Sequence, residues 1–151
     1  MSTASKTAHS LNDLIQIARD GKDFYTDAAP KVKDAELAQL FNKIAATKQN
    51  IVDQLSRVVA ANGKEPAQHG TLVGSLQEFY GKTRAALGDT QYGYVAELEE
   101  SEDRLLKAFR ETVADADTTP EARRVIETLM PDVVQTHGIM RDRKLAMKRA
   151  A

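Results

Sequence analysis

The apolar residues of this chain recur at intervals of three and four over four long stretches, which is the spacing of amphipathic helices. No segment alternates between apolar and polar residues for the length of a strand. Charged residues make up 28% of the chain, enough to cover the outer faces of such helices. The pattern therefore predicts an all-α protein, an up-and-down four-helix bundle with a single hydrophobic interior.

Capping and helix-breaking residues set the expected limits of the first two helices. Ser10 predicts the start of the first helix, which leaves residues 1–9 as a flexible N-terminus. Pro30 should stop or kink this helix, because proline lacks an amide donor. Asp34 is a typical cap for a second helix that ends before Gly63.

The second half of the chain is predicted to hold two more long helices. Residues 64–70 read as a crossover loop that contains proline and glycine. The third helix of the bundle is expected to be broken near Gly88 into a short piece and a long piece. The Thr-Pro-Glu sequence that starts at Thr119 should open the last helix. Residues 10–149 are thus predicted to form one domain.

Composition limits the functions that this chain could carry. It has no cysteine, which excludes disulfides, thiolate metal sites and a cysteine nucleophile. The formal net charge is −1, so no overall field attracts nucleic acid or an anionic membrane. Neither a signal peptide nor a membrane-spanning run stands out, and we expect a cytoplasmic protein without a membrane partner.

Each apolar stripe except the first carries one charged or ionisable interruption: Lys48, Glu102 and His137. Tyr25 lies on the first stripe. A lone buried lysine or glutamate costs several kcal/mol, so each needs a partner. We predict a buried polar cluster of these four residues in which Lys48 pairs with Glu102, and Tyr25 or His137 adds a hydrogen bond. The cluster is either an ion pair that fixes helix register or a site that handles protons or metal.

Three segments resemble the ferritin-like superfamily: LNDLIQIARDGKDFYTDAA, LAQLFNKIAATKQNIVDQL, and ESEDRLLKAF followed by a last helix with a histidine. The resemblance is closest to a family of uncharacterised bacterial four-helix proteins, some of them associated with stress responses. It implies a ferritin-like bundle. Ferritin-like proteins with two irons take a Glu from each of two helices and a Glu-x-x-His motif from each of the other two.

The chain departs from that di-iron pattern. None of its three histidines follows a glutamate at the required spacing, and Lys48 would repel a cation from the centre. We therefore expect a non-enzymatic bundle with a degenerate metal site, no catalytic residue and no bound cofactor. The alternative is a metal-binding or redox protein that uses Glu102 and His137 with iron or manganese. Its candidate ligands are Glu99, Glu102, Asp103 and His137.

The expected partners are proteins. We predict a homo-oligomer, a dimer in the first instance, with an unidentified protein as a further partner. The proposed contact surface is the short helix, through its apolar residues Leu72, Leu76, Phe79 and Tyr80. Nucleic-acid binding is not expected, since the basic segment from Arg141 to Arg149 has no interleaved aromatic residues.

Overall fold

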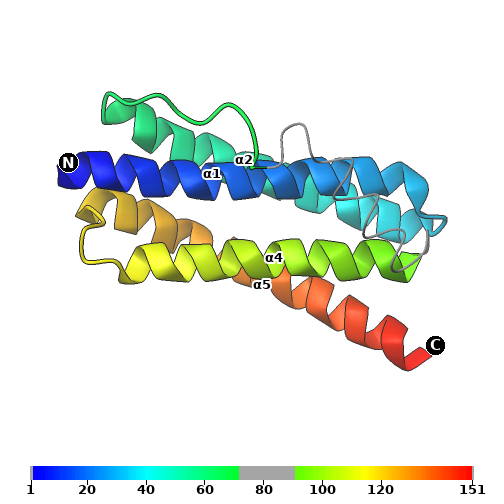
Figure 1. The fold of residues 1–151 in the computed structure, drawn as a ribbon. Helices are drawn as coiled ribbons and strands as arrows, with labels where there is room; N and C mark the ends of the chain where they lie inside the picture. The colour runs from blue at the N-terminus through cyan, green and yellow to red at the C-terminus, as the bar shows by residue number, and fades with distance from the viewer. Residues whose placement is uncertain (1, 72–90, 151) are drawn as a thin grey trace.

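The computed structural model describes residues 2–71 and 91–150, and within them every regular element is helical. The long helices lie side by side as a bundle (Figure 1), which confirms the all-helical, four-helix prediction. None of the described helices has an apolar stretch long enough to cross a lipid bilayer. The helices are α1 (Thr3–Ala28), α2 (Ala35–Ala61), α4 (Gln91–Ala114) and α5 (Pro120–Ala150), with a 3₁₀ turn, η1 (Ala29–Lys31), after α1.

Helix α1 begins earlier than we predicted. It starts at Thr3, where the Ser2 hydroxyl caps it by accepting a hydrogen bond from the Ser5 amide at 3.1 Å. Thr7 and Ala8, only 1% and 3% exposed, already belong to the buried face. The predicted start at Ser10 was therefore wrong, and most of residues 1–9 form the first turns of α1.

The other helix limits follow the expected cap chemistry. The Asp34 carboxylate accepts hydrogen bonds from two amides at the start of α2, those of Glu36 at 2.9 Å and Leu37 at 3.4 Å. Gly63 follows the end of α2 with a φ of 75°, a left-handed conformation that suits glycine. The Thr119 hydroxyl accepts from the Ala122 amide at 3.4 Å and caps α5.

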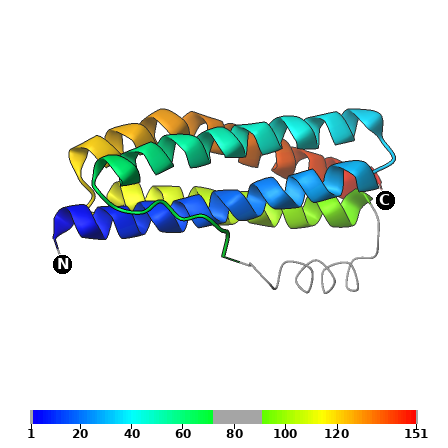
Figure 2. The ribbon, with the colours of Figure 1, turned by 90° about the horizontal axis from the view of Figure 1, so that it is seen from above.

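The direction of α4 corrects the up-and-down prediction. The Asp34 amide donates to the Gln91 side chain at 2.8 Å, so α2 and α4 begin at the same end of the bundle. Helices α1 and α5 run one way and α2 and α4 the other, as the colours in Figures 1 and 2 show. The order is up, down, down, up, because the chain returns along the bundle between α2 and α4 instead of turning sharply.

The first part of this return is a strap, residues 64–71, that lies along α1 (Figure 2). The Asn12 side chain donates to the Glu65 carbonyl at 3.1 Å and accepts from the Ala67 amide at 2.8 Å. Further along α1, Arg19 donates to the Ala67 carbonyl at 3.1 Å. The predicted short helix with Leu72, Leu76, Phe79 and Tyr80 lies outside the described residues.

The buried apolar side chains form two separate cores along the bundle. The first core lies towards the N-terminus of α1 and includes Leu11, Leu55, Phe109 and Ile126. The second core lies at the opposite end and includes Phe24, Phe41, Leu98 and Met140. Every long helix contributes to both cores and leaves at least one full turn between them.

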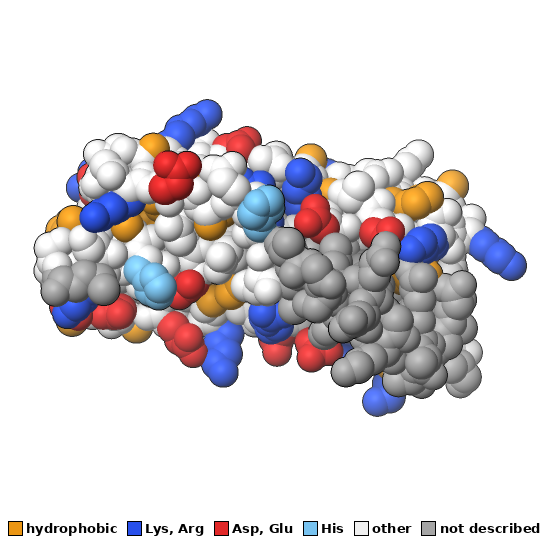
Figure 3. Space-filling model, turned by 45° about the horizontal axis from the view of Figure 1, so that its top comes forward, with side chains coloured by type: hydrophobic (Ala, Val, Ile, Leu, Met, Phe, Trp, Pro, Cys, Tyr) orange, Lys and Arg blue, Asp and Glu red, His pale blue; other side chains and the backbone are white. Residues whose placement is uncertain are grey.

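Charged side chains cover much of the outside. On the face shown in Figure 3, hydrophobic side chains form only small areas between charged and neutral polar ones. Among the described residues, the large hydrophobic side chains that stand exposed are Val134 at 43% and Leu145 at 44%, both on α5. Apolar burial is therefore concentrated in the two cores.

We predict that Asp34→Ala lowers the free energy of unfolding by about 1 kcal/mol, because two amides at the start of α2 lose their acceptor. Urea denaturation followed by circular dichroism measures this change. Asp34→Asn is the matched control, since its amide oxygen still caps the helix. An equal loss in both variants would contradict the capping role.

Candidate functional site: a buried polar layer

A polar layer separates the two cores, and all four helices contribute to it. Its members are Tyr25 from α1, Lys48 from α2, Glu102 from α4 and Thr136 from α5. The exposed fractions of these residues are 0%, 1%, 0% and 5%. The layer is thus shut off from solvent at the middle of the bundle.

The Glu102 carboxylate is the centre of this layer. Its Oε1 accepts a hydrogen bond from the Tyr25 hydroxyl at 2.8 Å. The Lys48 ammonium lies 2.8 Å from each carboxylate oxygen, and the Thr136 hydroxyl lies 2.8 Å from Oε2. Three different helices therefore supply donors to one carboxylate on the fourth.

The remaining polar atoms are also partnered. Lys48 Nζ donates to the Thr136 hydroxyl at 2.9 Å in addition to both oxygens of Glu102. The Tyr25 ring packs edge-on against Phe41 at 5.7 Å between centroids, so its apolar part belongs to the second core. Because positive and negative charge balance inside the layer, it needs no outside ion.

Gly21 makes room for the lysine. A Cβ at this position would lie 3.8 Å from Cε of Lys48 and 3.5 Å from the hydroxyl of Ser101, both ordinary van der Waals distances. The aliphatic part of Lys48 therefore crosses α1 where the helix has no side chain. A large residue at position 21 would collide with it.

Burial lowers the pKa of Lys48, because removal from water disfavours the charged amine. The negative charge of Glu102, its hydrogen bond and, more weakly, the charge of Asp132 oppose this shift. Glu102 thus exerts the strongest of the effects that favour the protonated form of Lys48.

The structure brings Tyr25, Lys48 and Glu102 together but leaves His137 outside. His137 Nε2 lies 3.0 Å from a carboxylate oxygen of Asp103, and their side chains are 16% and 70% exposed. One residue turns a helix by about 100°, so His137 points to the seam with α4 while Thr136 points inward. Placing His137 in the buried cluster was wrong. Thr136 could have been found by its place on the stripe of Val133 and Met140.

The candidate metal ligands do not converge. Glu102 lies within the polar layer, Asp103 pairs with His137, and Glu99 lies 3.6 Å from the ammonium of Lys144. Within residues 2–71 and 91–150 no three His, Asp or Glu side chains are grouped as a metal site would require. The described residues thus offer a two-residue pair at the α4–α5 seam and no larger ligand set.

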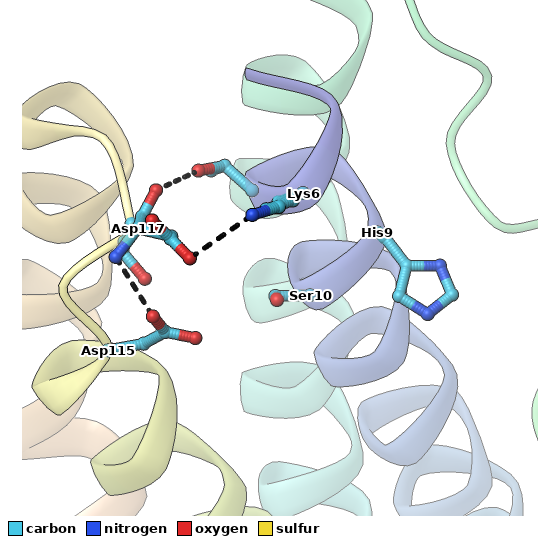
Figure 4. A pocket seen from close by; sticks show the side chains of 7 residues that line it. Lys6, His9, Ser10, Asp115 and Asp117 are labelled. Carbon is cyan, nitrogen blue, oxygen red and sulfur yellow. Dashed lines mark hydrogen bonds and ion pairs between the residues drawn. The ribbon is translucent and has the colours of Figure 1, made fainter. Parts of the chain in front are cut away.

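The pocket in Figure 4 lies where α1 passes the turn between α4 and α5, and has a volume of about 240 Å³. Lys6 pairs with the Asp117 carboxylate at 3.5 Å, and the Asp117 amide donates to Asp115 at 2.9 Å. His9 points away from these groups. Lys6 and Asp117 bind each other and fasten α1 to the turn, while the Asp115 carboxylate is held by a backbone amide, so these groups do not converge on a ligand.

Comparison with known protein families assigns the chain to one of them. A family model described as a domain of unknown function (DUF2383) matches residues 6–115. The chain belongs to this family. The DUF2383 match includes Tyr25, Lys48 and Glu102 and ends before Thr136. No curated protein and no solved structure matches the chain. The ferritin-like resemblance, the bacterial origin and the stress association stay predictions.

We predict that Lys48→Met and Glu102→Gln each lower the free energy of unfolding by about 3–5 kcal/mol, because each leaves a buried charge without its partner. The double variant should lose less than the sum of the two single losses. A double-mutant cycle in urea measures the coupling. Additive losses would contradict a direct ion pair.

The pH dependence of Glu102→Gln gives a second prediction. Without the Glu102 charge the pKa of Lys48 falls further. Between this lowered pKa and about 10.4, the usual value for lysine, the unfolded chain binds more protons than the folded one. The free energy of unfolding of this variant should therefore rise with pH across that window. The parent shows the same rise only above its own, less lowered Lys48 pKa, so the difference between variant and parent should rise between the two Lys48 pKa values and stay level above them. Urea titrations at several alkaline pH values measure it, and a falling difference would contradict the assignment.

Gly21 gives a third prediction. Gly21→Ala should raise the free energy of unfolding by about 0.5–1 kcal/mol, because alanine favours the helix and its Cβ fits. Gly21→Leu should lower it, since the larger side chain meets the stem of Lys48. Thermal unfolding of the two variants checks both signs.

Proposed function

We propose that this DUF2383 protein is a non-enzymatic bundle of ferritin-like architecture in which an ion pair takes the place of a metal centre, and which acts by binding another protein chain. The observation that carries this proposal is the closed polar layer. Side chains of three helices converge on one carboxylate of the fourth, much as four helices would converge on a metal, yet the cation beside this carboxylate is Lys48. A side chain of the protein therefore supplies the positive charge that a metal ion would supply in a metal centre.

The chain topology supports the ferritin-like part of the proposal. Bundles of that type have one long crossover connection, and here the chain likewise returns along the bundle between α2 and α4. The closed layer supports the non-enzymatic part. A catalytic acid, base or nucleophile must reach a substrate, whereas Tyr25, Lys48 and Glu102 are at most 1% exposed.

The alternative is a metal-binding or redox function based on Glu102 and His137. What favours it is the contact between His137 and Asp103, a histidine–carboxylate pair at the α4–α5 seam. Glu102 is held in the polar layer by three other side chains, so it would have to leave them to join this pair. We therefore rank this function second.

Metal content tests the proposal. We expect the purified protein to hold far less than one equivalent of metal, before and after anaerobic incubation with ferrous iron or manganese, because Lys48 satisfies the carboxylate. Elemental analysis after desalting measures this. Stoichiometric metal that is lost in Glu102→Gln would overturn the proposal, and metal lost in His137→Ala would favour the alternative.

Replacing the built-in cation gives a more demanding test. Lys48→Glu places a second carboxylate beside Glu102, and we expect Mn²⁺ to raise the Tm of this variant but not that of the parent. Lys48→Gln is the matched control, since it removes the charge without adding a ligand. An equal change in the Tm of both variants on addition of Mn²⁺ would contradict the proposal that Lys48 takes the place of a metal ion.

A further inference from the structure

In the part of the chain that the structure describes, α2 and α5 are packed less extensively against each other than the other neighbouring long helices α1 and α2, α4 and α5, and α1 and α4. A groove of about 350 Å³ lies along it. Val125 and Leu129 of α5 supply its apolar part. The remaining lining residues are polar: Asn50, Gln54, Arg124, Thr128 and Asp132.

The charges of this groove are separated. Arg124 and Asp132 are eight residues apart on α5, about 12 Å along the helix axis. Within the described part of the chain, neither side chain forms a hydrogen bond or a close ion pair, although Asp132 exerts a longer-range attraction on Lys48. The groove thus offers a positive charge at one end and a negative charge at the other.

Thr128 lies midway between these charges, four residues from each. Consider a second copy whose α5 runs antiparallel to the first and is related to it by a two-fold axis at Thr128. Asp132 of the second copy then lies beside Arg124 of the first, and Arg124 of the second copy lies beside Asp132 of the first. The same axis relates Glu121 to Gln135, both exposed and seven residues from Thr128. This arrangement is the self-complementary pattern of a two-fold interface.

We propose that the α2–α5 groove binds the α5 helix of a second copy, which forms a two-fold symmetric dimer centred on Thr128. The partner helix covers the half-buried Val125, which lies beside the already buried Leu129, and two Arg124–Asp132 pairs fix its direction. Thr128 is small and lets the two helices approach closely at the axis. This inference rests on the proposed function, since it specifies which protein chain is bound, a second copy, and through which surface, the α2–α5 groove.

Charge exchange tests the pairing. Sedimentation velocity of the full chain between about 1 and 200 µM should show a concentration-dependent dimer. Arg124→Asp should weaken it at least about tenfold, since two carboxylates then face each other. The swap Arg124→Asp/Asp132→Arg should restore it. Glu127→Lys, on an exposed part of α5 that does not line the groove, is the matched control and should leave the dimer unchanged.

Cross-linking tests the position of the axis without relying on affinity. The chain has no cysteine, so Thr128→Cys carries the single thiol, which should form an intermolecular disulfide on mild oxidation. Arg124→Cys should not, because its two copies would lie about 12 Å apart along the axis, beyond the reach of a disulfide. Circular dichroism confirms that each variant is folded, and oxidised Thr128→Cys in urea serves to detect non-specific coupling.

A protein that stays monomeric over the whole concentration range would overturn the inference. So would a dimer that survives Arg124→Asp unchanged, since the partner would then use another surface. Metal content measured on the same samples separates the outcomes. A metal-free monomer contradicts the dimer and leaves the closed polar layer in place, whereas stoichiometric metal bound through Glu102 contradicts the proposed function itself.

Discussion

The ion pair between Lys48 and Glu102 is the interaction on which the interior of this bundle depends. It joins α2 to α4, which are parallel and diagonally opposed, across the middle of the molecule. Tyr25 and Thr136 attach the two remaining helices to the same carboxylate. A hydrophobic interface alone would tolerate sliding of one helix along another, but a shift of one turn, about 5.4 Å, would break every one of these hydrogen bonds. We therefore infer that the polar layer specifies the register of all four helices.

Stability and specificity divide between different parts of the interior. The two cores bury the large apolar side chains and supply the hydrophobic free energy. A buried ion pair contributes little net stability, because desolvation offsets its attraction, yet the loss of one partner is costly. The lowered pKa of Lys48 reflects the same desolvation. The polar layer thus adds little to the stability of the native packing, but it makes any packing that separates Lys48 from Glu102 costly in free energy.

Much of this arrangement is readable from the sequence, and the failures have physical reasons. Lys48 and Glu102 stand out because each interrupts an apolar stripe, and charge complementarity then leads to their pairing. Thr136 lies on the stripe of Val133 and Met140 but does not stand out, since an uncharged threonine there demands no partner. His137, at the margin of that stripe, drew the assignment because histidine is chemically conspicuous. The direction of α4 could not be derived from the spacing of apolar residues, because that spacing is the same whichever way a helix runs in the bundle. It is seen in the contact between Asp34 and Gln91, more than fifty residues apart.

The order of the helices has a consequence for how the chain folds. Helices α1 and α2 form one local hairpin and α4 and α5 another. The first hairpin holds the cation and the tyrosine, and the second holds the carboxylate and the threonine. A hairpin that collapses alone carries a charged side chain, Lys48 or Glu102, whose partner lies on the other hairpin. Each half is therefore incomplete until the two associate. We infer that association of the halves and neutralisation of the interior occur together, which would couple two locally encoded units into one cooperative transition.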